Sequence, residues 1–86
     1  AVVFNNVSGD VFTPDQREAF KAWLENGGGY VGIHAAGDNS HEKWGWYMNE
    51  VIGTVFTQHT MKPQFQKATV HVEGAGHPAT QGLPAS

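Results

Sequence analysis

The residues of this chain that could do chemistry are its histidines, of which there are five among 86 residues. One of them, His34, lies in Gly32-Ile33-His34-Ala35-Ala36. The small-x-X-x-small outline of this segment is typical of a nucleophile elbow, where a tight strand-to-helix turn presents the central side chain. An imidazole there suits general acid/base work, polarisation or metal ligation. We predict that His34 is the centre of a functional site; the alternative is a histidine that only bonds loop backbone.

Two other histidines could share this chemistry. His59 lies in a polar loop after an apolar stretch, and His77 precedes a proline in a Gly-rich turn. With His34 they could act as acid/base groups or hold a divalent metal such as zinc, although their spacing matches no recognised ligand pattern. Solvated loop histidines are the alternative. His71 is expected to be exposed, and His41 to lie in the solvated first turn of a helix.

Composition excludes several other functions. The chain has no cysteine, which removes disulfides, thiolate metal sites and Cys nucleophiles. Five Lys and Arg against eight Asp and Glu give a net charge of −3, which argues against nucleic acid as a partner because phosphate neutralisation dominates that affinity. There is no apolar run long enough for a membrane span and no signal-peptide pattern. We expect a soluble protein, cytoplasmic or exported, whose compartment the sequence does not give.

The elements that must position these residues begin with the apolar run Ala1–Phe4, which predicts a strand buried on both faces. A Thr-x-x-Gln capping box at Thr13 and Gln16 starts a helix that Gly27 ends. The run Tyr30–Ile33 predicts a second buried strand. Strand, helix and strand together predict a βαβ unit, and hence two parallel strands with a right-handed crossover.

The second half of the chain predicts one more helix and further strands. Apolar residues recur at helical spacing from 44 to 52, and Gly53 follows them. Trp46 points off this stripe and could stack on the face of a sugar. The short run Thr54–Phe56 is either another strand or the exit from the helix. Lys67–Glu73 alternates between apolar and polar residues, which predicts a half-exposed strand at the sheet edge.

Polar side chains follow both predicted parallel strands. The first strand runs into Asn5 and Asn6, and the second runs into His34. In open parallel α/β sheets, ligands bind beyond the carboxyl ends of the strands. We therefore predict that His34 and His59 are catalytic, and that Asn5, Asn6, Trp46 and His77 bind substrate.

The run Gly27-Gly28-Gly29-Tyr30-Val31-Gly32-Ile33-His34-Ala35-Ala36 resembles the ThuA-like (trehalose utilisation) domain, as do Val2–Asn6, His59 and the segment 77–84. The resemblance covers essentially the whole chain. It implies a flavodoxin-like fold, with a parallel sheet flanked by helices, similar to class I glutamine amidotransferases. It also implies that residues 1–86 are one partial ThuA-like domain, with further strands before Ala1 and an acidic segment after Ser86.

The resemblance also implies a function. In class I glutamine amidotransferases the elbow carries a Cys nucleophile where this chain has His34, and Asn5 and Asn6 lie where the oxyanion-hole loop follows a strand. We therefore expect no Cys-dependent amidotransferase activity. ThuA-like domains are associated with the utilisation of trehalose, other disaccharides or keto-sugars, in bacteria often beside sugar oxidoreductases. The expected partners are a small-molecule sugar and the remainder of the parent domain, with a sugar oxidoreductase as a further candidate partner. The alternative is a non-catalytic sugar-binding or interaction module on the same scaffold.

Overall fold

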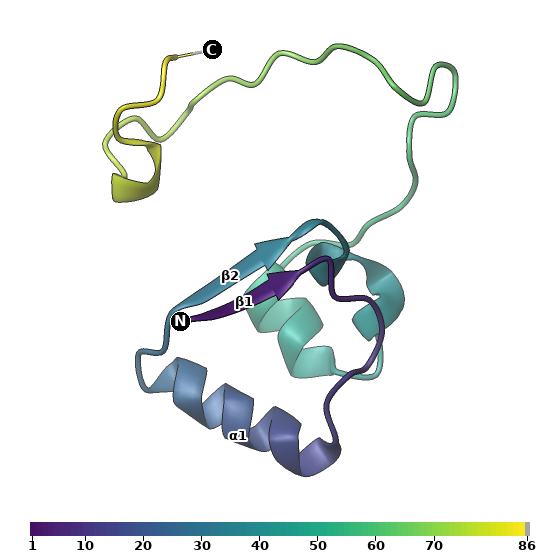
Figure 1. Cartoon of the computed structure of the whole chain (residues 1–86), viewed down its shortest axis with the longest axis vertical. Coiled ribbons are helices and arrows are strands. Elements are labelled where there is room, and N and C mark those ends of the chain that lie inside the picture. Colours follow the sequence, from purple (N-terminus) through teal and green to yellow (C-terminus); the bar gives the residue numbers. More distant parts are fainter. Residues whose placement is uncertain (86) are drawn as a thin grey trace.

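Two parallel strands form the sheet of this α/β chain (Figure 1). The structure, a computed structural model, describes residues 1–85. Strand β1 (Val2–Asn5) pairs with β2 (Tyr30–Ile33) in parallel, with Val3 opposite Val31 and Asn5 opposite Ile33. Helix α1 (Pro14–Glu25) connects the two strands. The predicted βαβ unit is thereby confirmed.

The ends of α1 follow the sequence signals. The Thr13 side chain accepts a hydrogen bond from the Gln16 backbone N–H at 3.3 Å, and the Gln16 side chain accepts one from the Thr13 N–H at 2.9 Å. At the other end, Gly27 has a φ of +94°, a left-handed conformation that glycine adopts without steric cost. The predicted capping box and C-terminal glycine are both confirmed.

An aromatic core lies on one face of the sheet. Phe4 of β1 stacks on Phe20 of α1 with ring centroids 5.7 Å apart, and Trp44 stacks on Tyr47 at 4.8 Å. Phe4 also contacts Tyr47, so the helical segment that contains Tyr47 packs on the same face of the sheet as α1. Such aromatic pairs add about 0.5–1.5 kcal/mol each beyond the area that they bury. This cluster fixes both helical segments against the strands.

The opposite face of the sheet is exposed within the described residues. Val3, Val31 and Ile33 keep 54%, 50% and 46% of their surface accessible. The predictions that Ala1–Phe4 is a strand buried on both faces and that Tyr30–Ile33 is a buried strand are therefore both wrong for residues 1–85. The physical reason is that both helical segments pack on the Phe4 side and leave the other side uncovered.

The segment after β2 is helical but irregular. It forms two short 3₁₀ turns, η1 (His34–Gly37) and η2 (Asn39–His41), before the π-helix η3 (Tyr47–Ile52). Gly53 ends η3 with a φ of +69°, and its N–H bonds the Met48 carbonyl five residues back. The predicted second helix is thus present, with its last turn wider than an α-helix.

In the second half, one open alternative is decided and one predicted strand is absent from the described structure. Thr54–Phe56 is irregular, so of its two alternatives the exit from η3 is the one confirmed. Lys67–Glu73 is not a strand, and all of it except Val72 is exposed. An alternating pattern makes a strand only where a neighbouring strand accepts its hydrogen bonds, and here the segment runs clear of the sheet toward η4 (Pro78–Thr80) (Figure 1). Within residues 1–85, no helix is long and apolar enough to cross a membrane.

Removing the N-cap of α1 tests how much this end of the helix contributes. We expect Thr13→Ala to lower the free energy of unfolding by about 1 kcal/mol, because the Gln16 N–H then loses its acceptor. Urea unfolding followed by circular dichroism measures this change. Thr60→Ala is the matched control, because Thr60 is exposed in an irregular segment. Equal losses in the two variants would contradict a capping role.

Candidate functional site

His34 lies at the carboxyl end of β2, on the first residue of η1, and its side chain is exposed. Its φ is +56°, a left-handed conformation that is uncommon for any residue other than glycine. The backbone therefore has the geometry of the elbow that the sequence predicts. This conformation costs on the order of 1 kcal/mol, and it persists only where the surroundings fix it.

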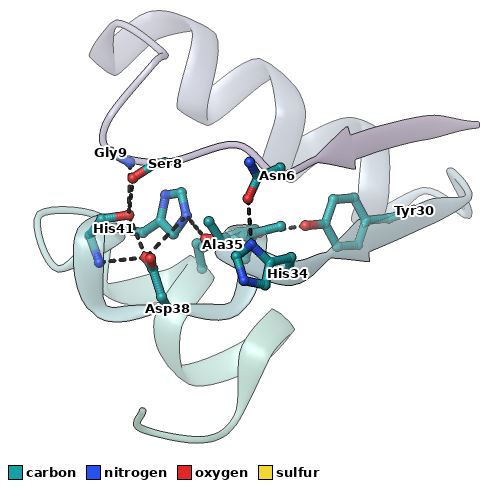
Figure 2. A network of polar contacts seen from close by, with 11 residues as sticks. Asn6, Ser8, Gly9, Tyr30, His34, Ala35, Asp38 and His41 are labelled. Atoms are coloured by element: carbon teal, nitrogen blue, oxygen red, sulfur yellow. Dashed lines mark hydrogen bonds and ion pairs between the residues drawn. The ribbon is translucent and has the colours of Figure 1, made fainter. Parts of the chain in front are cut away.

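Asn6 is the polar partner of His34. It follows β1, has a φ of +59°, and donates its backbone N–H to the Ile33 carbonyl at 3.0 Å. Its side-chain Oδ1 lies 2.5 Å from His34 Nδ1 (Figure 2). Because an amide oxygen carries no hydrogen, Nδ1 donates and Nε2 keeps its lone pair. His34 is therefore oriented as a proton acceptor through Nε2. Asn5 is exposed and pairs with Ile33 within the sheet.

Two buried side chains hold the turn that follows His34. The Tyr47 hydroxyl donates to the Ala36 carbonyl at 2.6 Å, and His41 Nε2 donates to the Ala35 carbonyl at 3.0 Å. Tyr47 is completely buried and its hydroxyl also bonds that of Tyr30. His41 is only 2% exposed, so the expectation of a solvated His41 is wrong. The reason is that its ring packs edge-on against Tyr47, at 5.1 Å between centroids.

A second set of hydrogen bonds ties the loop after β1 to the loop after β2. Ser40 Oγ accepts the Gly9 backbone N–H at 2.7 Å, while the Ser40 N–H donates to Asp38 Oδ1 at 2.8 Å. The Ser40 hydroxyl also donates to Asp38 Oδ1 (Figure 2). These bonds hold the pKa of Asp38 below its usual range, so the carboxylate is charged at neutral pH. The two loops carry Asn6 and His34, which are thereby kept opposite one another.

A hollow of about 150 Å³ opens beside His34, and it brings His34 and His59 to one site. The Phe56 and His59 rings pack 4.9 Å apart, and Asn39 Nδ2 donates to the Phe56 carbonyl at 2.6 Å. That bond holds the segment after η3 against the η1–η2 turns. The hollow is lined by His34, Ala35, Gly37, Asp38, Phe56 and His59.

The other two predicted binding residues lie elsewhere. His77 caps η4, where its Nδ1 accepts the Ala79 N–H at 3.1 Å, at the far end of the chain from the sheet (Figure 1). Trp46 packs on Trp44 at 5.8 Å and under the Lys21 ammonium at 5.8 Å, and it lines a different hollow. The structure therefore does not bring His77 or Trp46 to His34.

The predicted metal site can be tested against the donors present. Within residues 1–85, no three His, Asp or Glu side chains lie close enough together to hold a metal ion. His77 caps η4, which is remote from the segments that carry His34 and His59 (Figure 1). Catalytic zinc takes three protein ligands, and two imidazoles fall short of that number. The residues of this site thus do not fit the predicted three-His zinc centre.

Comparison with known protein families identifies the family of this chain. The family model described as trehalose utilisation (ThuA) matches residues 1–86. The chain belongs to the ThuA family. The resemblance stated from the Gly27–Ala36 run is thereby confirmed, and at the family level the role is trehalose utilisation. No curated protein and no solved structure matches the chain.

Sequence reasoning misses four residues of this candidate site. Asp38 and Ser40 fall in a polar loop, where the Asp-x-Ser spacing is a recognisable capping signal. Tyr47 fits the apolar stripe, and nothing in its spacing indicates that its hydroxyl holds the elbow. The burial of His41 is missed because the sequence does not show that the chain folds back over it.

The Asn6–His34 hydrogen bond predicts a specific tautomer of the ring. In the native chain we expect His34 to carry its hydrogen on Nδ1, because Asn6 Oδ1 is the acceptor. Asn6→Gly removes that acceptor while suiting the left-handed backbone, so the preference for Nδ1–H should be lost. Nitrogen-15 shifts of the imidazole ring measure the tautomer. Asn5→Ala should leave the shifts unchanged; an unchanged tautomer in Asn6→Gly would refute the assignment.

The buried Tyr47 hydroxyl predicts a loss of stability in alkali. Burial, and then the hydrogen bond with Tyr30, raise the pKa of Tyr47 far above its usual range. In the unfolded chain this hydroxyl ionises near pH 10. Below about pH 10 this hydroxyl keeps its proton in both states, so it does not change the free energy of unfolding. Above about pH 10 only the unfolded state loses the proton, and the free energy of unfolding falls. Urea unfolding from pH 8 to 11 should show a shallower decline for Tyr47→Phe; equal slopes would contradict this cause.

Proposed function

We propose that this ThuA domain binds a sugar in the His34 hollow, at the carboxyl end of β1 and β2, and processes it by proton transfer at His34. One observation carries the proposal: His34 stands on a left-handed elbow with Nδ1 fixed by Asn6 Oδ1 and its side chain exposed. Nε2 is then a positioned proton acceptor, which is what a general base requires. His59 lines the same hollow and is the candidate to return a proton.

The lining of the hollow suits part of a sugar. Asp38 and the two imidazoles can hydrogen-bond hydroxyl groups, while the Phe56 ring offers an apolar surface to the carbon face of a sugar ring. The volume of about 150 Å³ is below the roughly 300 Å³ at which typical ligand pockets begin. The hollow therefore suits the reacting ring of a disaccharide or keto-sugar. The family role in trehalose utilisation supports this substrate class.

The proposed chemistry begins with a proton transfer to His34. The O–H bond of a sugar hydroxyl breaks as its proton passes to His34 Nε2, which leaves an alkoxide on the sugar and an imidazolium on the protein. Asn6 Oδ1 accepts from Nδ1 in both charge states, so the ring keeps its orientation. The carboxylate of Asp38 lines the same hollow and stabilises the positive ring by charge attraction.

The proposal excludes glutamine hydrolysis through a thioester. The elbow position carries His34 and the 86 residues contain no cysteine, so no thiolate of this chain can attack an amide. A flavodoxin-like sheet, like that of class I glutamine amidotransferases, remains the proposed parent architecture. The parallel β1–β2 pair with its crossover helix α1 supports it.

A non-catalytic sugar-binding module is the second candidate, and one observation favours it. His59 lies on an irregular segment that the Asn39–Phe56 hydrogen bond holds to the turns, while His34 lies at the end of a strand. Catalytic groups are placed most precisely on helices and strands. Such a site could bind a sugar through His34 without a positioned second acid.

Replacing His34 tests the proposed function. We expect His34→Ala to weaken trehalose binding by about tenfold, since tenfold corresponds to one good hydrogen bond, and to reduce turnover of keto-trehalose by about 10²–10⁴-fold. Binding is measured by NMR titration and turnover by following the sugar products. His71→Ala, at an exposed histidine, is the matched control.

The outcomes separate the two candidates. Unchanged binding and turnover in His34→Ala would overturn the proposal. Loss of binding in His34→Ala, with no turnover by the native chain, would favour the non-catalytic module.

A further inference from the structure

We infer that Asp38 selects the ligand of this site: its carboxylate binds hydroxyl groups of a neutral sugar and turns away phosphorylated sugars. The inference deepens the proposed function and rests on it, because it concerns the hollow that Asp38 shares with His34 and His59. Asp38 belongs to the turn between η1 and η2, and Figure 2 shows it beside His34.

One oxygen of Asp38 is committed and the other is available. Oδ1 accepts both hydrogen bonds from Ser40, and it is also the oxygen that lies 4.0 Å from His41 Nε2. Within residues 1–85, no hydrogen bond or ion pair engages Oδ2. The side chain keeps 35% of its surface accessible. A ligand in the hollow can therefore reach a carboxylate oxygen whose orientation Ser40 already fixes.

The charge of Asp38 makes that oxygen a strong acceptor for hydroxyl groups. The hydrogen bonds from Ser40 lower its pKa, so the carboxylate is ionised at neutral pH. A hydroxyl group that donates to an ionised oxygen forms a shorter and stronger bond than one that donates to a neutral acceptor. Two neighbouring sugar hydroxyls could thus donate to Asp38 Oδ2 and to His34 Nε2.

The same charge disfavours an anionic ligand. Phosphate sites in proteins are built from Arg, Lys or the N-terminus of a helix. The residues that line this hollow include no Arg or Lys, and the one carboxylate among them is that of Asp38. A phosphate group beside Asp38 would meet like-charge repulsion. The hollow is therefore matched to an unphosphorylated sugar.

Two variants separate the charge of Asp38 at the hollow from the net charge of the chain. Asp38→Asn keeps the size of the side chain and an oxygen that can accept the Ser40 N–H, but it removes the charge. Glu73→Gln is the matched control, because it removes one negative charge from an exposed residue that does not line the hollow. Each variant is titrated at pH 8 with trehalose and with trehalose 6-phosphate, and binding is followed by NMR.

We expect the native chain and Glu73→Gln to bind trehalose at least about tenfold more tightly than its phosphate. Asp38→Asn should bind trehalose about tenfold more weakly than the native chain, the effect of losing one charge-assisted hydrogen bond, and should largely lose the discrimination.

The inference would be overturned if Asp38→Asn bound trehalose with native affinity and still discriminated against trehalose 6-phosphate. If His34→Ala loses trehalose binding while Asp38→Asn keeps it, only the role of Asp38 fails. If neither substitution changes trehalose binding, the proposed function fails as well.

Discussion

The hydrogen bond between Asn6 and His34 joins two residues that both have left-handed backbones, each just beyond the end of a strand. Neither conformation is favourable alone, at a cost on the order of 1 kcal/mol each. The parallel register of β1 and β2 brings the two strand ends together, and the Asn6 N–H on the Ile33 carbonyl fixes their spacing. The orientation of the imidazole, and hence the site, depends on this pair.

Two sets of hydrogen bonds hold Asn6 and His34 in place. In the first set, the buried Tyr47 and His41 each donate to a carbonyl of the turn after His34. In the second set, Ser40 ties the loop that follows Asn6 to the turn that contains Asp38. Tyr47 belongs to the aromatic core and also bonds the Ala36 carbonyl. The packing that stabilises the chain therefore also fixes the turn at His34.

The fold brings some of the predicted site residues together and keeps others apart, for physical reasons that differ between them. His34 and Asn6 follow directly from strands, so their meeting could be deduced from a βαβ unit alone. His59 reaches the same hollow only because Asn39 holds the Phe56 carbonyl, a contact between segments that no spacing rule predicts. Trp46 and His77 carry suitable side chains, yet one packs on Trp44 and the other caps a distant turn.

The sequence by itself determined the elements whose signals are local: the capped helix α1, the two apolar strands and their parallel pairing, the elbow at His34, and the family. Tertiary structure alone decided which side chains are buried and which reach the site. His41 became an internal donor and Asp38 a lining residue because the chain folds back after η1. The alternating Lys67–Glu73 segment formed no strand because a strand requires a partner, and a partner is a property of the whole fold.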